Sequence, residues 1–427
     1  MATILHTSDT HLDVLTYNES RAPDHDEVLA ETVEIARQVK PDLVLHTGDL
    51  FHSVRPSTEA MQRAFAWLQE LEAIAPAGVI VECGNHDSPN LFRLFTKILG
   101  EDSRIRFIDK ARLPRDGGIL DLAARNGERL RVASLPFVHA NRVLGEEILG
   151  DAGRWTGSYA DYIHRVEEVL AGGLKEGYDP PHDVLIFAAH LHVAGAKFSR
   201  SERPLHISEI YGTTLEALPV VNFAAFGHIH RPQPLPGTLV TGEYAGSPIP
   251  IDFGEEGEEK SVVIYEATPQ APTKVSRVPL RRGRPLWRFT GTLDELRTCA
   301  SSVGKALALV IVRTTEPAVD LSDHVRELLP AATLLQVVEE CSSRKLQALT
   351  RADAAATEEL DFTTMFAEFL SQRGTRVGSA DRVLKAFKTL VEAVGDEGPP
   401  TFAEETLLVD STVDGGSTSP EALGAAS

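Results

Sequence analysis

The chain has 427 residues, of which 42% are hydrophobic and 24% charged, a composition that suits a large globular protein of two or three domains. Its formal net charge of −20 argues against a general nucleic-acid binder, because phosphate backbones attract basic surfaces. Three cysteines without a CxxC spacing exclude a disulfide scaffold and a zinc–thiolate protein.

The net charge weakens the hypothesis of a DNA substrate but does not exclude it, because the charge is unevenly distributed. Residues 395–427 hold seven acids and no Lys or Arg, whereas 281–288 read "RRGRPLWR". The N-terminus has no basic region followed by a long apolar stretch, and no run approaches the length of a membrane span. We therefore expect a cytoplasmic protein with no membrane segment.

The first hundred residues alternate between strand and helix patterns. Strand patterns cover 2–9, 42–49 and 78–85, and apolar residues at helical spacing cover 27–39 and 58–74. This order predicts a parallel sheet with right-handed crossovers. Ligands of such sheets bind beyond the carboxyl ends of the strands, where the clusters "DTH", "GDLFH" and "GNHD" fall.

Three later strand patterns cover 183–190, 223–230 and 261–267, and the first two end in histidine. The stretch "GEEGEEK" at 254–260 is interpreted as a turn on a solvated edge. "ATPQAPTK" at 267–274 is interpreted as a linker. We therefore expect a first domain over 1–270.

The remaining chain predicts three further regions. Residues 279–340 give the order strand, helix, strand, helix, strand, which indicates a smaller second domain. Within 355–394, amphipathic helices are expected at 362–374 and 380–394, and periodicity alone leaves open whether they pack on the body or dock on a partner helix. The Gly-, Ser- and acid-rich residues 395–427 are expected to be disordered.

Five predicted strand ends finish in Asp, Asn or His side chains. They supply Asp9, His11, Asp49, His52, Asn85, His86, His190, His228 and His230. Carboxylates, an amide and imidazoles without thiolate suit Mn, Fe or Zn, since Mg prefers an oxygen-only set. Seven ligands are too many for one tetrahedral ion and fit two ions that share a bridging carboxylate.

Histidines outside this pattern are interpreted as structural, because a lone histidine more often makes a hydrogen bond than binds a metal. His6 and His46 lie inside strand patterns. The same interpretation is given to His25, His139, His164, His182, His206 and His324.

The motifs D-x-H, G-D-x-x-H, G-N-H-D, a distant H and G-H-x-H, in this order, resemble the signature of the calcineurin-like metallophosphoesterases. Longer stretches such as "HTGDLFHSVRPS", "AHLHVAGAKFS" and "FGHIHRPQPL" resemble the SbcD branch of the Mre11 nuclease family. The resemblance covers 1–270 and continues more weakly through 279–390. It implies an α/β fold: a two-sheet αββα core, a smaller α+β capping domain that binds DNA, and C-terminal helices that bind a partner.

The resemblance also implies a role for each strand-end residue. One ion is expected on Asp9, His11, Asp49 and His230, and the other on Asp49, Asn85, His190 and His228. His86 is expected as the catalytic histidine and His52 as a second functional histidine. His192, the other candidate at the distant-histidine motif, is interpreted as a residue behind the metal ligands or as a structural residue. Asp87 is expected either to orient a ligand or to close its turn and cap the next helix.

The implied function is that of the SbcD-like subunit of an SbcCD DNA repair nuclease that uses two divalent ions, with Mn²⁺ expected. The implied activities are a single-strand endonuclease, an ATP-dependent 3′–5′ double-strand exonuclease and hairpin opening. ATP hydrolysis is assigned to an SbcC-like partner because the chain has no GxxxxGK[ST] motif. A homodimer within a heterotetramer is expected.

Two alternatives belong to other classes. One is a phosphoesterase that acts on small nucleotides or other phosphodiesters. The long extension after the first domain argues against it, because such an enzyme needs no capping domain. The other is a non-catalytic scaffold, which a complete set of expected ligands argues against.

Overall fold

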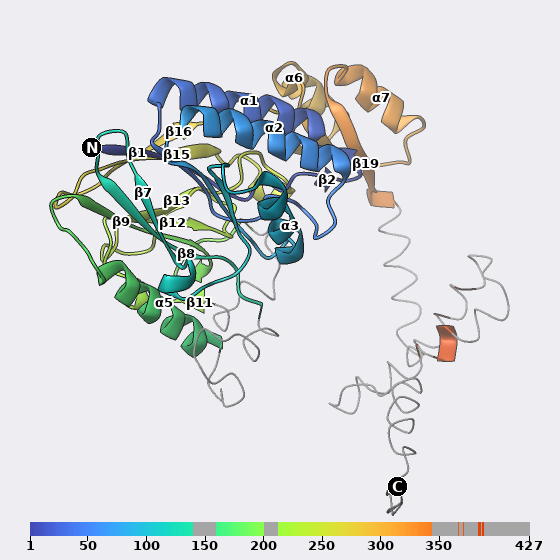
Figure 1. Cartoon of the computed structure of the whole chain (residues 1–427). Coiled ribbons are helices and arrows are strands. Elements are labelled where there is room, and N and C mark those ends of the chain that lie inside the picture. Colours follow the sequence, from blue (N-terminus) through green and yellow to red (C-terminus); the bar gives the residue numbers. More distant parts are fainter. Residues whose placement is uncertain are drawn as a thin grey trace, which may run out of the picture. The chain divides into compact units, whose positions relative to one another are not determined.

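The computed structural model describes residues 1–139, 159–199 and 212–343, together with 366, 370, 383–385 and 387 (Figure 1). The chain divides into two compact units, Met1–Ser342 and Ser343–Ser427. The helices expected at 362–374 and 380–394 and the tail 395–427 fall mostly outside the described residues. In the part of the chain that is described, no helix is long and apolar enough to cross a membrane.

A six-stranded sheet of order β16-β15-β1-β4-β5-β6 carries the N-terminal strands. Its members are β1 (Ala2–Thr7), β4 (Leu43–His46), β5 (Gly78–Glu82), β6 (Ile105–Ile108), β15 (Ser261–Ala267) and β16 (Lys274–Pro279). Strands β1, β4, β5 and β6 run parallel, whereas β15 runs antiparallel to β1. The parallel order predicted from the alternation of strand and helix patterns is confirmed.

A second six-stranded sheet has the order β13-β14-β12-β9-β8-β7. Its members are β7 (Ile119–Ala123), β8 (Arg129–Leu135), β9 (Asp183–His190), β12 (Phe223–Gly227), β13 (Gln233–Pro234) and β14 (Gly242–Tyr244). The four central strands β8, β9, β12 and β14 run parallel. Two short pairs lie outside these sheets, β2 (Leu15–Thr16) with β3 (Glu19–Ser20) and β10 (His192–Val193) with β11 (Gly212–Thr213).

Helices cover the outer faces of both sheets. The first sheet packs against α1 (Ala22–Val39), α2 (Thr58–Ile74) and α3 (Pro89–Leu99), and the second packs against α5 (Tyr159–Lys175) (Figure 1). A third set of buried apolar side chains, including Leu45, Ile80 and Val184, fills the space between the sheets. The two-sheet αββα core predicted for the chain is therefore confirmed.

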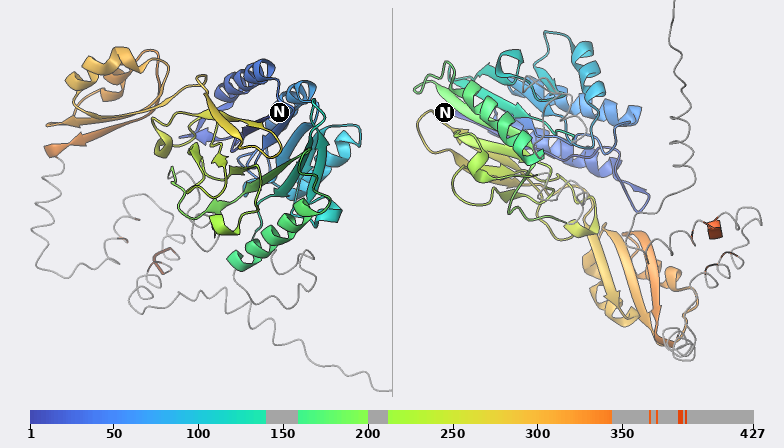
Figure 2. Two further views of the ribbon diagram at one scale, coloured as in Figure 1. Left: turned by 90° about the vertical axis from the view of Figure 1, so that its left-hand side faces the viewer. Right: turned by 90° about the horizontal axis from the view of Figure 1, so that it is seen from below.

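A smaller α/β module follows β16 in the chain. It runs β17 (Leu286–Gly291), α6 (Leu293–Val303), β18 (Leu307–Thr314), α7 (Leu321–Leu328) and β19 (Thr333–Cys341), and its three strands are parallel (Figure 2). The Thr292 and Glu295 side chains form a capping box at the start of α6. Short 3-10 helices occur at η1 (Pro114–Asp116), η5 (Leu215–Ala217) and η6 (Phe253–Glu255).

Two expectations for the segment 254–274 are wrong. Residues 267–274 are not a linker between domains, because they connect β15 to β16 within the first sheet. These two strands pair antiparallel, with Ser261 opposite Pro279 and Glu266 opposite Lys274. The stretch "GEEGEEK" is not simply a solvated turn, because Glu255 is 0% and Lys260 4% exposed. These two charged side chains can be buried because the Glu255 carboxylate and the Lys260 ammonium form an ion pair, with 2.6 Å between oxygen and nitrogen.

Candidate metal centre

The predicted site residues come from the carboxyl ends of five strands in two different sheets. In the first sheet, Asp9 and His11 follow β1, Asp49 and His52 follow β4, and Asn85 and His86 follow β5. In the second sheet, His190 ends β9, and His228 and His230 follow β12. All except His52 are buried, so they form an interior cluster rather than a surface patch.

The loops that carry these residues have strained backbone. Asp9 and His11 have φ of 49°, Asp49 has φ of 54° and His228 has φ of 91°. A residue other than glycine in this left-handed region costs about 1–2 kcal/mol. Strain of this kind persists where surrounding structure enforces it, and it concentrates at functional sites.

One set of potential ligands consists of Asp9, His11 and His230, whose donor atoms all lie within 4.8 Å of one another. The Nε2 atoms of His11 and His230 are 3.1 Å apart. Burial lowers the pKa of His11 well below its usual value, so its imidazole is neutral. Two imidazole nitrogens this close need a proton or a cation between them, which fits a metal position.

A second set consists of Asp9, Asp49 and His190, again with donor atoms within 4.8 Å of one another. The Asn85 side-chain oxygen lies 2.9 Å from Nε2 of His190 and 2.9 Å from Nδ1 of His228. One oxygen of Asp49 lies 3.5 Å from His190 Nε2 and 3.6 Å from His11 Nε2. Asp9 belongs to both sets, and this Asp49 oxygen lies near a histidine of each, so both carboxylates lie between the two sets.

The electrostatics of the two buried carboxylates also favour cations. Burial raises the pKa of Asp9 to about 6. Burial acts on Asp49 in the same direction, but the His190 and His86 imidazoles hold its pKa well below the usual value. Buried carboxylates are stable when they are paired or coordinate metals. Together with the sulfur-free donor set, this fits two divalent ions.

His86 is anchored at the edge of the cluster. Its backbone N–H donates to Asp49 at 2.7 Å, and its Nδ1 donates to the His52 carbonyl oxygen at 2.8 Å. Since a carbonyl oxygen only accepts, Nδ1 of His86 carries a proton, and Nε2 remains for a substrate. Donor atoms of His86, His52 and His11 lie within 4.8 Å of one another.

Asp87 joins two of the loops. Its carboxylate accepts backbone N–H groups from Gly84 at 2.9 Å, Leu50 at 3.2 Å and Phe51 at 2.9 Å. It therefore closes the "GNHD" turn and ties that turn to the loop after β4. The predicted helix-capping role is wrong, because the side chain of Ser88 caps α3 by accepting from the Leu91 N–H.

Histidines interpreted as structural brace the same loops. The ring of His6 is hydrogen-bonded to the Thr47 hydroxyl at 2.8 Å, and the ring of His46 to the Thr10 hydroxyl at 2.8 Å. The loops after β1 and β4 are thus held reciprocally. His192 is buried beside Phe198, with ring centroids 4.9 Å apart, and among the described residues it joins neither ligand set.

Sequence reasoning missed Glu255. Its carboxylate accepts from Nδ1 of His230 at 3.0 Å, although the two residues belong to separate segments. The sequence does not distinguish Glu255 from Glu256 and Glu259, acids of the same stretch that are exposed. Its only sequence signal is its place within "DFGEEGEEK", between two apolar strand patterns.

Comparison with known families gives two matches along the chain. The calcineurin-like phosphoesterase family matches residues 2–232, more than half of the chain. The SbcD_C family, described as the type 5 capsule protein repressor C-terminal domain, matches residues 282–373. The first match contains all nine predicted site residues.

Comparison with individual proteins gives relatives that are each named as the SbcD component of the nuclease SbcCD. The one from Bacillus subtilis is 30% identical over 69% of this chain and 74% of its own length. The one from Rhodobacter capsulatus is 28% identical over 69% of this chain and 75% of its own length. The one from Escherichia coli K12 is 27% identical over 61% of this chain and 63% of its own length.

Proposed function

Because the chain belongs to the calcineurin-like phosphoesterases and, among them, to the SbcD nuclease subunits, we propose that it cleaves DNA with two divalent ions within an SbcCD-type repair complex. It is a metal-dependent nuclease of this family. The observation that carries the two-metal proposal is the position of Asp49, one oxygen of which is 3.5 Å from His190 Nε2 and 3.6 Å from His11 Nε2. Carboxylates shared in this way hold metal pairs about 3.5–4 Å apart.

The proposed ligands divide into two sets that share Asp49. One ion is assigned to Asp9, His11, Asp49 and His230, and the other to Asp49, Asn85, His190 and His228. Mixed nitrogen and oxygen donors without sulfur suit Mn, Fe or Zn, and Mn²⁺ is proposed among these from the family. Bound there, two divalent ions would lower the pKa of a water and neutralise charge on the phosphoryl oxygens.

The role proposed for His86 is to donate a hydrogen bond or a proton from Nε2, with both ring nitrogens protonated, to a phosphoryl or leaving oxygen. Its Nδ1 bond to the His52 carbonyl supports this role, because it fixes the ring orientation and leaves Nε2 for the substrate. The ring of His52 has its centroid 5.4 Å from that of His86, close enough for both side chains to contact one phosphate.

The finer activities are proposed from the family alone. They are single-strand endonuclease activity by this chain and, with an SbcC-like ATPase, 3′–5′ double-strand exonuclease activity and hairpin opening. The proposed organisation is a nuclease domain, expected over 1–270 and extended here to the end of β16, followed by a capping domain expected over 279–340. Partner-binding helices over 355–394 and a homodimer within a heterotetramer complete the proposal. The match of residues 282–373 to the SbcD_C family supports a role for this region beyond catalysis.

The test compares two substrates and two histidine variants. Purified full-length protein with Mn²⁺ is assayed on single-stranded circular DNA and on bis(p-nitrophenyl) phosphate. His86→Ala should lose cleavage of both by about 10²-fold or more. His182→Ala, which changes a histidine with a 69% exposed side chain, should retain it. Cleavage of the small ester without DNA cleavage would instead favour a small-molecule phosphoesterase.

Partner binding has its own test. A variant lacking residues 362–394 is co-expressed with an SbcC-like ATPase, and the complex is isolated by affinity purification. Loss of co-purification, with Mn²⁺-dependent cleavage of single-stranded DNA retained, is the expected result. Unchanged co-purification would overturn the assignment of the partner-binding helices.

A further inference from the structure

The imidazole of His230 is held from behind by a buried ion pair. Glu255, in η6, accepts from His230 Nδ1 at 3.0 Å through one oxygen. Its other oxygen accepts from Lys260 Nζ at 2.6 Å and from the Ser247 hydroxyl at 2.8 Å. Glu255 is 0% and Lys260 4% exposed, so both charges are withdrawn from water.

The same cluster also holds the backbone of His230. Its carbonyl oxygen accepts from Lys260 Nζ at 3.0 Å and from the Ser247 backbone N–H at 3.0 Å. The third donor of Lys260 reaches Glu258 at 3.1 Å. All three N–H bonds of the ammonium group are therefore used. Both the ring and the main chain of His230 are fixed by residues 247–260.

We propose that Glu255 and Lys260 are positioning residues that hold His230 with Nε2 aimed into the metal centre. A proton on Nδ1 that is donated to Glu255 leaves the lone pair on Nε2, 3.1 Å from Nε2 of His11. Lys260 balances the charge of Glu255, so the carboxylate stays an acceptor without raising the net negative charge of the site. This inference rests on the metal centre of the proposed function.

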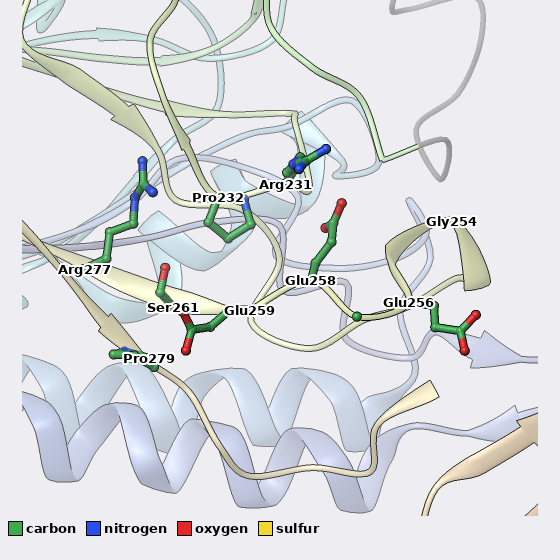
Figure 3. A pocket seen from close by; sticks show the side chains of 10 residues that line it. Arg231, Pro232, Gly254, Glu256, Glu258, Glu259, Ser261, Arg277 and Pro279 are labelled. Carbon is green, nitrogen blue, oxygen red and sulfur yellow. The ribbon is translucent and has the colours of Figure 1, made fainter. Parts of the chain in front are cut away.

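The outer wall of the cluster faces solvent. Glu258 and Glu259 line a cavity of about 510 Å³ beside Arg231 (Figure 3). Glu259 has a 70% exposed side chain and contacts Arg281 at 4.0 Å. It carries the same charge as Glu255 in the same turn but does not reach His230, which makes it a matched control.

The experiment separates positioning from packing with a double variant. Glu255→Leu alone leaves the Lys260 ammonium buried without its main partner, so that variant is expected to lose stability. Glu255→Leu/Lys260→Met removes both charges and keeps apolar volume, so its thermal unfolding temperature should return close to that of the wild type. Lost support for a metal-bound histidine typically weakens metal binding by about 10–100-fold.

Mn²⁺ binding is followed by calorimetry on the apo full-length chain. The double variant should bind one of two Mn²⁺ ions about 10–100-fold more weakly, while Glu259→Gln binds both like the wild type. A conservative Glu255→Gln change keeps an acceptor oxygen and should lie in between. Wild-type Mn²⁺ affinity in a folded double variant would overturn the positioning role. Failure of the wild type itself to bind Mn²⁺ would instead overturn the proposed function.

Discussion

Replacing Asp87 with alanine should destabilise the protein by breaking the link between two metal-site loops. The Asp87 side chain is buried and accepts backbone N–H groups from Gly84, Leu50 and Phe51. A buried donor left without an acceptor costs about 1–3 kcal/mol, so three donors set the expected loss at about 3–6 kcal/mol, allowing for some relaxation. Asp87→Asn keeps one acceptor oxygen and should lose roughly half as much.

The assay is urea denaturation of the full-length protein in excess chelator, so that bound metal does not contribute to stability. Asp116→Ala serves as the control, because the Asp116 side chain is 59% exposed and should contribute within about 0.5 kcal/mol. A loss below about 1 kcal/mol for Asp87→Ala would refute the reasoning, since it would mean that the three N–H groups find water or other acceptors.

Three further outcomes are expected. In a calorimetric titration, Asp49→Asn should lower the affinity for both Mn²⁺ ions, because one Asp49 oxygen lies near both ligand sets. Asn85→Ala should lower the affinity for one ion. Burial raises the pKa of Glu167 to about 8, so the folded state retains a proton that the unfolded state releases above pH 4.5, and stability falls as pH rises between these values. Glu167→Gln should therefore gain about 3 kcal/mol at pH 7 and little at pH 4.5 in urea unfolding. Arg284→Ala should lose about 2–4 kcal/mol in the same assay, because Asp24 would keep a buried charge with fewer partners, whereas Arg281→Ala should change stability by less than about 0.5 kcal/mol.

Much of the fold was predictable because the strands are apolar runs that stop abruptly in polar residues. Helix 58–74 and strands 183–190 and 261–267 have in the structure the limits expected from sequence. Within each sheet, the clustering of the site residues follows from one rule, that parallel strands deliver their carboxyl ends to the same edge. That rule needs only strand direction, which the alternation with helices supplies.

The parts that sequence could not give depend on tertiary register. Glu255 meets His230 only because η6 folds back beside the loop after β12, and no local pattern distinguishes it from the exposed Glu256. Asp87 bonds N–H groups 36 and 37 residues away as well as that of Gly84, three residues before it. The composition of the chain between β15 and β16 does not distinguish a hairpin from a linker, because turns and linkers are both rich in Pro and Thr.

The basic segment 281–284 does not resolve the conflict between a net charge of −20 and a DNA substrate. Helix α1 supplies acids to it: Glu34 pairs with Arg282, Asp24 with Arg284, and Glu31 accepts the backbone N–H groups of Arg281 and Arg282. The side chains of Arg282 and Arg284 hold the segment leading to β17 against α1, so exchanging their partners for DNA phosphates would loosen that attachment.

The proposed metal centre would itself supply positive charge where a phosphate binds. Two divalent ions outweigh the charges of Asp9 and Asp49, and the other proposed ligands are an amide and neutral imidazoles, so the occupied site would be positive within an acidic protein. Buried beneath low-dielectric walls, such a charge acts strongly at short range and weakly beyond a Debye length. The expected consequence is that binding of single-stranded DNA depends more steeply on bound Mn²⁺ than on salt. This follows because nonspecific contacts that release counterions require a basic surface.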